Sequence, residues 1–253
     1  MSTAGYAHLP ANWRAPAEYL RDRVVLVAGA AGGLGHASAL ACARAGARVV
    51  LLGRRIARLE KIHDEIMALH AAPPALYPLD LAGASPRDYG ELAATLEREY
   101  GRLDGIVHAA AHFESLQPAI DIEADDWLRA MQVNVSAPFL LTQACLPLLR
   151  EAPQAGVVFV LDDLARVGKA HWGGYGVTKH ALAGLVSILR EEWESTNVRA
   201  HAVLPEPMRT ALRHKAYYGE DAAQVPSPDA TADAVVYLLG ADAAGVGDTL
   251  DLR

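Results

Sequence analysis

A short stretch near the N-terminus limits the folds that are open to this chain. Residues 24–28 are an uninterrupted apolar run, typical of a strand buried on both faces. The run leads directly into a turn that carries Gly29, Gly33 and Gly35, and a helical pattern follows over residues 34–45. Glycines at such a junction let the backbone approach a pyrophosphate, whose charge lies at the positive end of the helix. This order predicts a dinucleotide-binding fold, although a turn that only packs helix on strand is the simpler alternative.

Apolar runs of strand length alternate with amphipathic helical segments over the rest of the chain. Further strands are expected at residues 48–53, 75–78, 103–108, 156–161, 198–204 and 248–252. Helices are expected at residues 55–71, 86–100, 123–150 and 229–239 and around Tyr175, with Pro138 and Pro147 expected to bend or interrupt the segment 123–150. The alternation indicates parallel strands joined by right-handed crossovers. The predicted fold class is α/β, a single Rossmann-type doubly wound parallel sheet of about seven strands with helices on both faces.

Length and charge restrict the domain count and the partners. With 253 residues the chain has the size of one large α/β domain, predicted over residues 23–253 and preceded by an extended N-terminal arm at residues 1–22. The net charge of −7 and the lack of a Lys/Arg stripe argue against nucleic acid, and no apolar run is long enough to cross a bilayer. Cys42 and Cys145 lie in apolar helix-like segments, as expected of reduced core residues. We predict a cytoplasmic protein with a small-molecule partner and no contact with nucleic acid or membrane.

The histidines do not form a pattern typical of a metal site. His108 and His112 are four residues apart, but they straddle the end of a strand instead of sharing one helix face. No third ligand has a matching spacing, so no metal is predicted.

The residues after the second strand indicate the preferred cofactor. An acidic residue there would hold the ribose hydroxyls of NAD(H), whereas an arginine accommodates the 2′-phosphate of NADP(H). Arg54 stands at this place with no acid beside it, so NADP(H) is predicted in preference to NAD(H). The alternative is that Arg54 and Arg55 open the next helix as solvated charges. After the third strand, Asp80 is placed to meet an adenine amino group.

Tyr175 and Lys179 are four residues apart in a segment that is predicted to be a long helix. At this spacing both side chains lie on one helical face, where the ammonium favours the phenolate and lowers the pKa of the tyrosine. A tyrosine that exchanges protons near neutral pH is the functional interpretation. The alternative is a half-buried aromatic side chain with a solvated lysine.

Taken together, these motifs resemble the short-chain dehydrogenase/reductase family over nearly the full chain. The glycine turn, Asp80, Asn134, the Tyr175/Lys179 pair and the segment 205–210 follow one another in the order of that family. The resemblance implies a seven-stranded Rossmann-type sheet and hydride transfer between the nicotinamide of NAD(P) and a small carbonyl or alcohol substrate. It also implies a homodimer or homotetramer. The polar, aromatic and proline-bounded residues that follow the sixth strand predict a substrate loop near residues 206–228.

The resemblance implies a role for each matching residue. Tyr175 would be the proton donor, Lys179 would bind the nicotinamide ribose and lower the tyrosine pKa, and Asn134 would hold a water that links Lys179 to solvent. Thr210 would contact the carboxamide. The implied cofactor-binding residues are Gly29, Gly33, Leu34, Gly35, Arg54, Asp80, Leu81, Ala109, Tyr175, Lys179, Pro205 and Thr210.

The sequence departs from the family pattern at several positions. The threonine before the first glycine is Ala28, the Asn-Ala-Gly motif is replaced at residues 109–111 by three alanines, and the glycine after Pro205 is Glu206. Asp162 occupies the place of the serine that orients the substrate carbonyl, and Asp163 follows it.

Three interpretations of Asp162 are open. As a catalytic residue it would be protonated near neutrality and donate as the serine does, because a carboxyl group in an apolar site can stay neutral. An ionised Asp162 would repel the growing charge on the substrate oxygen and leave a catalytically impaired nucleotide-binding or scaffold protein. A side chain that turns away and caps the following turn is the third possibility.

Overall fold

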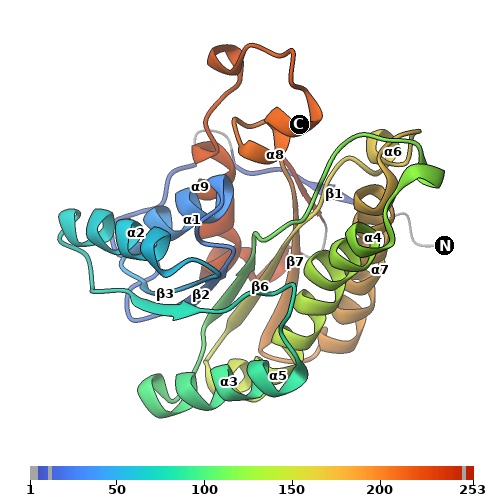
Figure 1. The fold of residues 1–253 in the computed structure, drawn as a ribbon. Helices are drawn as coiled ribbons and strands as arrows, with labels where there is room; N and C mark the ends of the chain where they lie inside the picture. The colour runs from blue at the N-terminus through green and yellow to red at the C-terminus, as the bar shows by residue number, and fades with distance from the viewer. Residues whose placement is uncertain (1–4, 11–12, 247–248) are drawn as a thin grey trace.

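The protein is described by a computed structural model that covers residues 5–10, 13–246 and 249–253. Its centre is one parallel sheet in the order β1-β8-β7-β6-β5-β2-β3-β4 (Figure 1). The strands are β1 (Tyr6–Ala7), β2 (Val24–Ala28), β3 (Arg48–Gly53), β4 (Ala75–Pro78), β5 (Gly105–His108), β6 (Ala155–Val160), β7 (Val198–Leu204) and β8 (Thr249–Asp251). The predicted fold class, a single parallel α/β sheet of Rossmann type, is confirmed.

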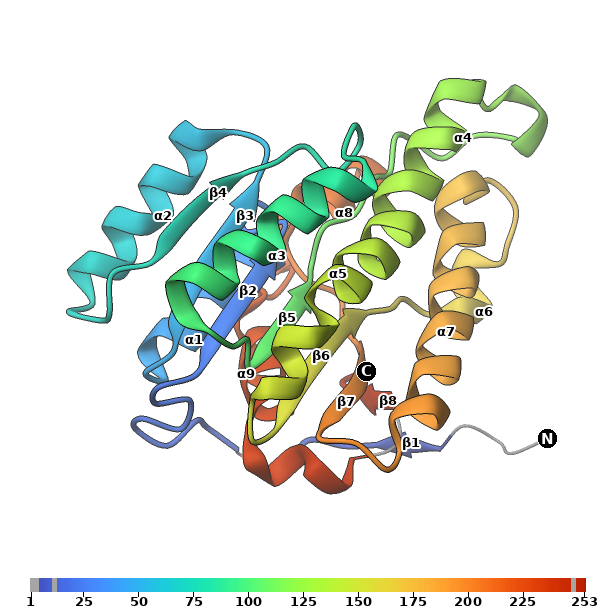
Figure 2. The ribbon, with the colours of Figure 1, turned by 90° about the horizontal axis from the view of Figure 1, so that it is seen from below.

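Helices cover both faces of the sheet, because its central strands are apolar on both sides. Val25 and Val27 of β2 pack in the core cluster under the helices α1 (Gly33–Arg44), α2 (Ile56–Ala68) and α9 (Asp229–Leu239). Leu26 and Ala28 point the other way, as alternate residues of a strand do. They pack in the cluster under α3 (Pro86–Tyr100), α5 (Ala137–Glu151) and α7 (Gly173–Trp193), which cross the sheet in Figure 2.

The long helix predicted over residues 123–150 is found as three consecutive helical pieces that run without a break from Ala124 to Glu151. The structure has α4 (Ala124–Met131), a π-helical turn over Gln132–Ser136, and then α5. Pro138 lies in the first turn of α5, directly after the π-helical turn. Pro147 lies inside α5, and the helix continues through it.

The sheet has one strand more than predicted, and it comes from the N-terminal segment. Tyr6 and Ala7 pair in parallel with Thr249 and Leu250 of β8. A strand of two residues has no hydrophobic periodicity, so the sequence gives no sign of it. Leu20 is completely buried, so the described part of the predicted arm packs on the domain.

The segment predicted as a substrate loop contains two short helical pieces, α8 (Ala211–Ala216) and a 3₁₀ turn over Ala222–Gln224. A further short helix, α6 (Leu164–Val167), follows β6. None of the helices in the described ranges has the length and apolar character needed to cross a membrane. Both cysteines are free and buried, and burial raises the pKa of each thiol to about 12.

The side chain of Asp104 connects the start of β2 to the segment before β5. Its side chain is 3% exposed, accepts a hydrogen bond from the Val24 N–H at 2.9 Å and pairs with Arg102 at 3.2 Å. Because β2 carries the glycine turn at its other end, this contact supports the strand on which the site depends.

We expect Asp104→Ala to lower the free energy of unfolding by about 1–3 kcal/mol, because it leaves the buried N–H of Val24 without an acceptor. Asp104→Asn keeps an oxygen acceptor and should lose less. Urea unfolding followed by circular dichroism measures the difference. Asp64→Ala, at a side chain that is 82% exposed, is the control and should stay within about 0.5 kcal/mol of the parent. Equal stability of the Asp104→Ala and Asp64→Ala variants would contradict the assignment.

Candidate active site

The carboxyl ends of the parallel strands surround a cavity of about 810 Å³. In a doubly wound sheet this edge is where ligands bind. Most of the predicted site residues line it, namely Gly29, Gly33, Leu34, Arg54, Asp80, Leu81, Ala109, Asp162, Tyr175, Lys179, Pro205 and Thr210. Gly35 and Asn134 are buried beside the cavity without lining it. The strand order thus brings together residues that are far apart in the sequence.

The glycine turn between β2 and α1 is closely packed on three sides. A Cβ atom on Gly29, whose φ is +84°, would lie 2.5 Å from the backbone nitrogen of Ala110. A Cβ on Gly35 would lie 2.1 Å from the Gly29 carbonyl oxygen, and one on Gly33 would lie 2.9 Å from Cγ2 of Thr210. The first N–H groups of α1 have no side-chain cap. Such a turn, open only toward the cavity at a helix N-terminus, fits the pyrophosphate of a dinucleotide.

Arginines follow β3 at the same edge. Arg54, Arg55 and Arg58 all line the cavity, and Arg55 is the N-cap residue of α2. Asp80 follows β4 and accepts a hydrogen bond from the Ala82 N–H at 3.1 Å. This end of the cavity is therefore positively charged, which suits a phosphate group.

Asp162 and Tyr175 are in direct contact at the end of β6. The Tyr175 hydroxyl donates to Oδ2 of Asp162 at 2.8 Å. Oδ1 accepts from the Asp163 N–H at 2.7 Å and forms an ion pair with Arg166. The carboxyl group is thus an acceptor at both oxygens, whereas the sequence left open a protonated donor. The third interpretation fits the neighbouring residue instead, because Asp163 caps α6 by accepting from the backbone of Ala165 and Arg166.

The pKa of Tyr175 is shifted in the direction opposite to the prediction. Burial, and then the negative charge of Asp162 and the hydrogen bond to it, raise the pKa of Tyr175 well above its ordinary value. Lys179 lies with Nζ 5.4 Å from the centre of the tyrosine ring and donates to the Val160 carbonyl at 2.8 Å. The predicted lowering by Lys179 is therefore wrong, because burial and the carboxylate dominate. Burial lowers the pKa of Lys179 itself to about 8.

Asn134 lies in the π-helical turn and connects three segments. Its Oδ1 accepts from the His112 N–H at 2.6 Å, and its Nδ2 donates to the His112 carbonyl at 2.9 Å and to Oγ1 of Thr178 at 3.0 Å. Thr178 in turn donates to the Tyr175 carbonyl at 2.7 Å. Asn134 thereby fixes the segment after β5 against α7, and the water that it was predicted to hold for Lys179 stays a prediction.

Arg166 is the main residue of the site that sequence reasoning missed. Its Nη1 donates to the Tyr217 hydroxyl at 2.7 Å, and its Cζ lies 5.1 Å from the centre of the Trp172 ring. An aspartate and an arginine four residues apart, as Asp162 and Arg166 are, is the signal that was available. Arg253 pairs with Asp163 at 2.9 Å, and no local pattern predicts that contact.

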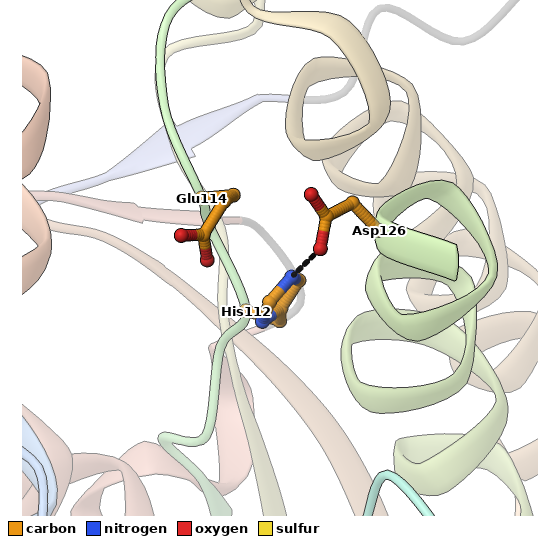
Figure 3. Close-up of side chains that lie close together, drawn as sticks. All are labelled: His112, Glu114 and Asp126. Carbon is orange, nitrogen blue, oxygen red and sulfur yellow. Dashed lines mark ion pairs between the residues drawn. The ribbon is translucent and has the colours of Figure 1, made fainter. Parts of the chain in front are cut away.

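A second group of polar side chains borders Tyr175. His112, Glu114 and Asp126 have their potential ligand atoms within 4.8 Å of one another, and Figure 3 shows the ion pair between His112 and Asp126. Nε2 of His112 is buried, has no hydrogen-bond partner and lies 3.9 Å from Oδ1 of Asp126. Lys215 pairs with Glu114 at 3.4 Å and Arg129 with Asp126 at 3.9 Å. Both carboxylates already have a cationic neighbour, which disfavours a bound metal ion.

His108, the other histidine considered at the end of β5, belongs to the core. It forms a hydrogen bond with Thr142 at 2.8 Å and stacks on Phe159 with the ring centres 4.9 Å apart. Burial lowers its pKa to about 3, so it is a neutral side chain that packs under the site.

Comparisons with known proteins agree at the level of sequence and of structure. The family model described as short chain dehydrogenase matches residues 23–221. YciK, an uncharacterized oxidoreductase of Escherichia coli K12, is 34% identical over 225 residues, which are 89% of each chain. A solved short chain dehydrogenase structure from Pseudomonas syringae has a TM-score of 0.90 and 39% identity, covering 98% of this chain and 99% of that chain. Another, from Escherichia coli CFT073 in complex with NADPH, has a TM-score of 0.89 and 34% identity, covering 93% of this chain and 99% of that chain.

Burial of Lys179 predicts a pH dependence of stability. The unfolded chain keeps the lysine proton up to about pH 10.5, whereas the folded protein releases it near pH 8. Between these values the unfolded state binds more protons, so stability rises with pH. We expect the unfolding free energy of the parent, measured relative to Lys179→Met, to increase from pH 8 to pH 10. Other groups cancel in this difference, and a flat difference across the window would show that the lysine titrates normally.

Proposed function

The chain belongs to the short-chain dehydrogenase/reductase family of NAD(P)-dependent oxidoreductases, and from this premise we propose that it uses NADP(H) to interconvert a small carbonyl compound and its alcohol. The observation that carries the proposal is Tyr175, which lines the same cavity as Lys179 and the glycine turn. A dinucleotide bound along this edge supplies or accepts the hydride. The side chains of the protein bind it, orient the substrate and move the proton.

Tyr175 is the proposed proton donor in the reduction of the carbonyl. Its raised pKa keeps the hydroxyl protonated at neutral pH, so Oη holds the proton that the substrate oxygen receives. Lys179 would hold the nicotinamide ribose, and Thr210 would contact the carboxamide. Thr210 sits at the N-cap of α8 against Gly33, which gives its backbone a fixed place over the glycine turn.

NADP(H) is the proposed cofactor because one end of the cavity is positively charged. Three arginines line the cavity next to β3, where the 2′-phosphate of a bound cofactor would lie. The related structure from Escherichia coli CFT073 was solved with NADPH, which supports the same choice here.

A small, largely apolar substrate fits the other end of the cavity. Phe113, Trp172 and Tyr217 line it, and Leu212 and Ala216 from α8 complete an apolar wall. The segment 206–228 would in this way shape the substrate site, as its sequence predicts.

A homo-oligomer remains part of the proposal. Phe139 of α5 and Val177 and Ile188 of α7 are exposed apolar side chains on helices that flank the sheet. Contact between copies through these helices would cover them.

We expect NADPH to bind more tightly than NADH and Arg54→Ala to remove most of the difference. The substitution deletes a charge-assisted contact of about 1.5–3 kcal/mol with the 2′-phosphate, while NADH affinity should hardly change. Fluorescence titration of the reduced cofactors measures both constants. Arg98→Ala, at an exposed arginine of α3, is the control. Equal affinities for both cofactors in the parent protein would refute the preference, and no binding at all would favour the non-catalytic alternative.

The Tyr175→Phe variant keeps the aromatic ring and removes the hydroxyl group that would donate the proton. We expect turnover to fall by roughly 10²–10⁴, the usual contribution of general acid–base catalysis, with NADPH affinity little changed. Steady-state oxidation of NADPH with a panel of benzaldehyde, acetophenone and cyclohexanone provides the rate. Tyr6→Phe, at a residue of β1 that is 59% exposed and outside the cavity, should keep parent activity. A Tyr175→Phe variant that turns over at the parent rate would exclude this mechanism.

A further inference from the structure

The site needs a hydrogen-bond donor that Asp162 does not supply. During carbonyl reduction negative charge grows on the substrate oxygen, and a donor aimed at that oxygen stabilises it. Asp162 accepts at both of its oxygens, and its own charge would oppose the reaction. We propose that Arg166, held in place by Asp162 and Tyr217, is the residue that donates to the substrate oxygen beside Tyr175. This inference rests on the proposed reduction of a carbonyl.

One carboxylate connects the two groups that would meet the substrate. Oδ2 of Asp162 accepts from the Tyr175 hydroxyl at 2.8 Å, and Oδ1 of the same carboxylate pairs with Nη2 of Arg166. The hydroxyl and the guanidinium therefore flank a single small side chain, and both line the cavity. In the proposed arrangement, the substrate oxygen would accept from both groups.

Arg166 is held in one orientation before any substrate arrives. Its Nη1 donates to the Tyr217 hydroxyl at 2.7 Å, and its guanidinium lies over the rings of Trp172 and Tyr217 at 5.1 and 5.9 Å. A guanidinium has five N–H groups in a fixed fork. The hydrogen bonds to Tyr217 and Asp162 therefore leave further N–H groups that can donate to a ligand. The side chain is 35% exposed, which leaves part of it open to the cavity. Such bracing lowers the entropic cost of binding.

Neutralisation of Asp162 is the competing role for Arg166. An aspartate that is only 12% exposed needs a cationic partner whether or not that partner touches substrate. The two roles predict different results when both charges are removed together. If Arg166 only neutralises, then removing the carboxylate charge as well should restore activity. If Arg166 donates, the double variant should stay slow.

Four variants test the proposal through NADPH oxidation with the carbonyl panel: Arg166→Leu, Arg166→Lys, Asp162→Asn, and Arg166→Leu combined with Asp162→Asn. We expect Arg166→Leu to lower kcat by about 10²–10³, the usual loss for one oxyanion donor, with a smaller change in KM. Arg166→Lys should recover part of the loss, because it keeps a charged donor without the fork. The double variant should remain at least about tenfold below Asp162→Asn, since the asparagine amide replaces only part of the donor.

Control measurements distinguish the loss of the Arg166 donor from unfolding and from a failure of the proposed reductase function. NADPH affinity should be unchanged in every variant, whereas the urea midpoint should fall in Arg166→Leu, which leaves Asp162 without its cation, and recover in the double variant. Arg98→Leu, at an exposed arginine of α3 outside the cavity, should keep parent activity. Parent-like kcat in Arg166→Leu, or recovery of the double variant to the level of Asp162→Asn, would overturn the role of Arg166 while a slow Tyr175→Phe leaves the reductase assignment standing. No turnover of the panel by the parent protein with NADPH bound would contradict the reductase assignment and this inference with it.

Discussion

Close packing around the glycine turn determines where every other part of the site lies. Gly29 leaves no room for a Cβ against Ala110, which holds the end of β2 beside the segment that follows β5. A Cβ on Gly33 would lie 2.9 Å from Cγ2 of Thr210, so the start of α8 lies on the same turn. The register that pairs Ala28 with His108 keeps these contacts in line with the sheet. Because all strands are parallel, this one turn brings the end of β2, the segment after β5 and the start of α8 together around the cavity.

Charge pairing explains how two neighbouring aspartates are accommodated at a place where the family resemblance implies a serine. Asp162 pairs with Arg166, and Asp163 pairs with Arg253 and also caps α6. A carboxylate in a largely buried place is costly unless a cation and hydrogen bonds compensate it. Each of the two aspartates has a cationic partner and accepts hydrogen bonds. The change from hydroxyl to carboxyl is therefore part of a connected charge network that also holds the aromatic wall formed by Trp172 and Tyr217.

The sequence predicts the elements better than it predicts the interactions between them. The bounds of α3, α9 and β7 agree with the prediction, because these segments are strongly periodic or bounded by helix-start and turn residues. The strand at Tyr6–Ala7 is too short to have a period, and its position depends on pairing with β8. The pKa of Tyr175 was predicted in the wrong direction for a related reason. The lysine four residues away is visible in the sequence, whereas burial and the contact with Asp162 exist only in the folded chain.

The raised pKa of Tyr175 would change how much proton donation contributes to stabilising the transition state of the proposed reaction. A tyrosine of high pKa keeps its proton at neutral pH, yet it is a weaker acid than one whose pKa lies near the working pH. Proton donation alone would then contribute less to the transition state, and more of the negative charge would remain on the substrate oxygen. A cationic donor is the group best suited to that charge, because a charge-assisted hydrogen bond is about twice as strong as a neutral one. Burial raises the pKa of Tyr175 most, and Asp162 adds to that rise. The Asp162–Arg166 pair would thus compensate for a shift to which Asp162 itself contributes, which makes the three side chains a single unit in the proposed mechanism.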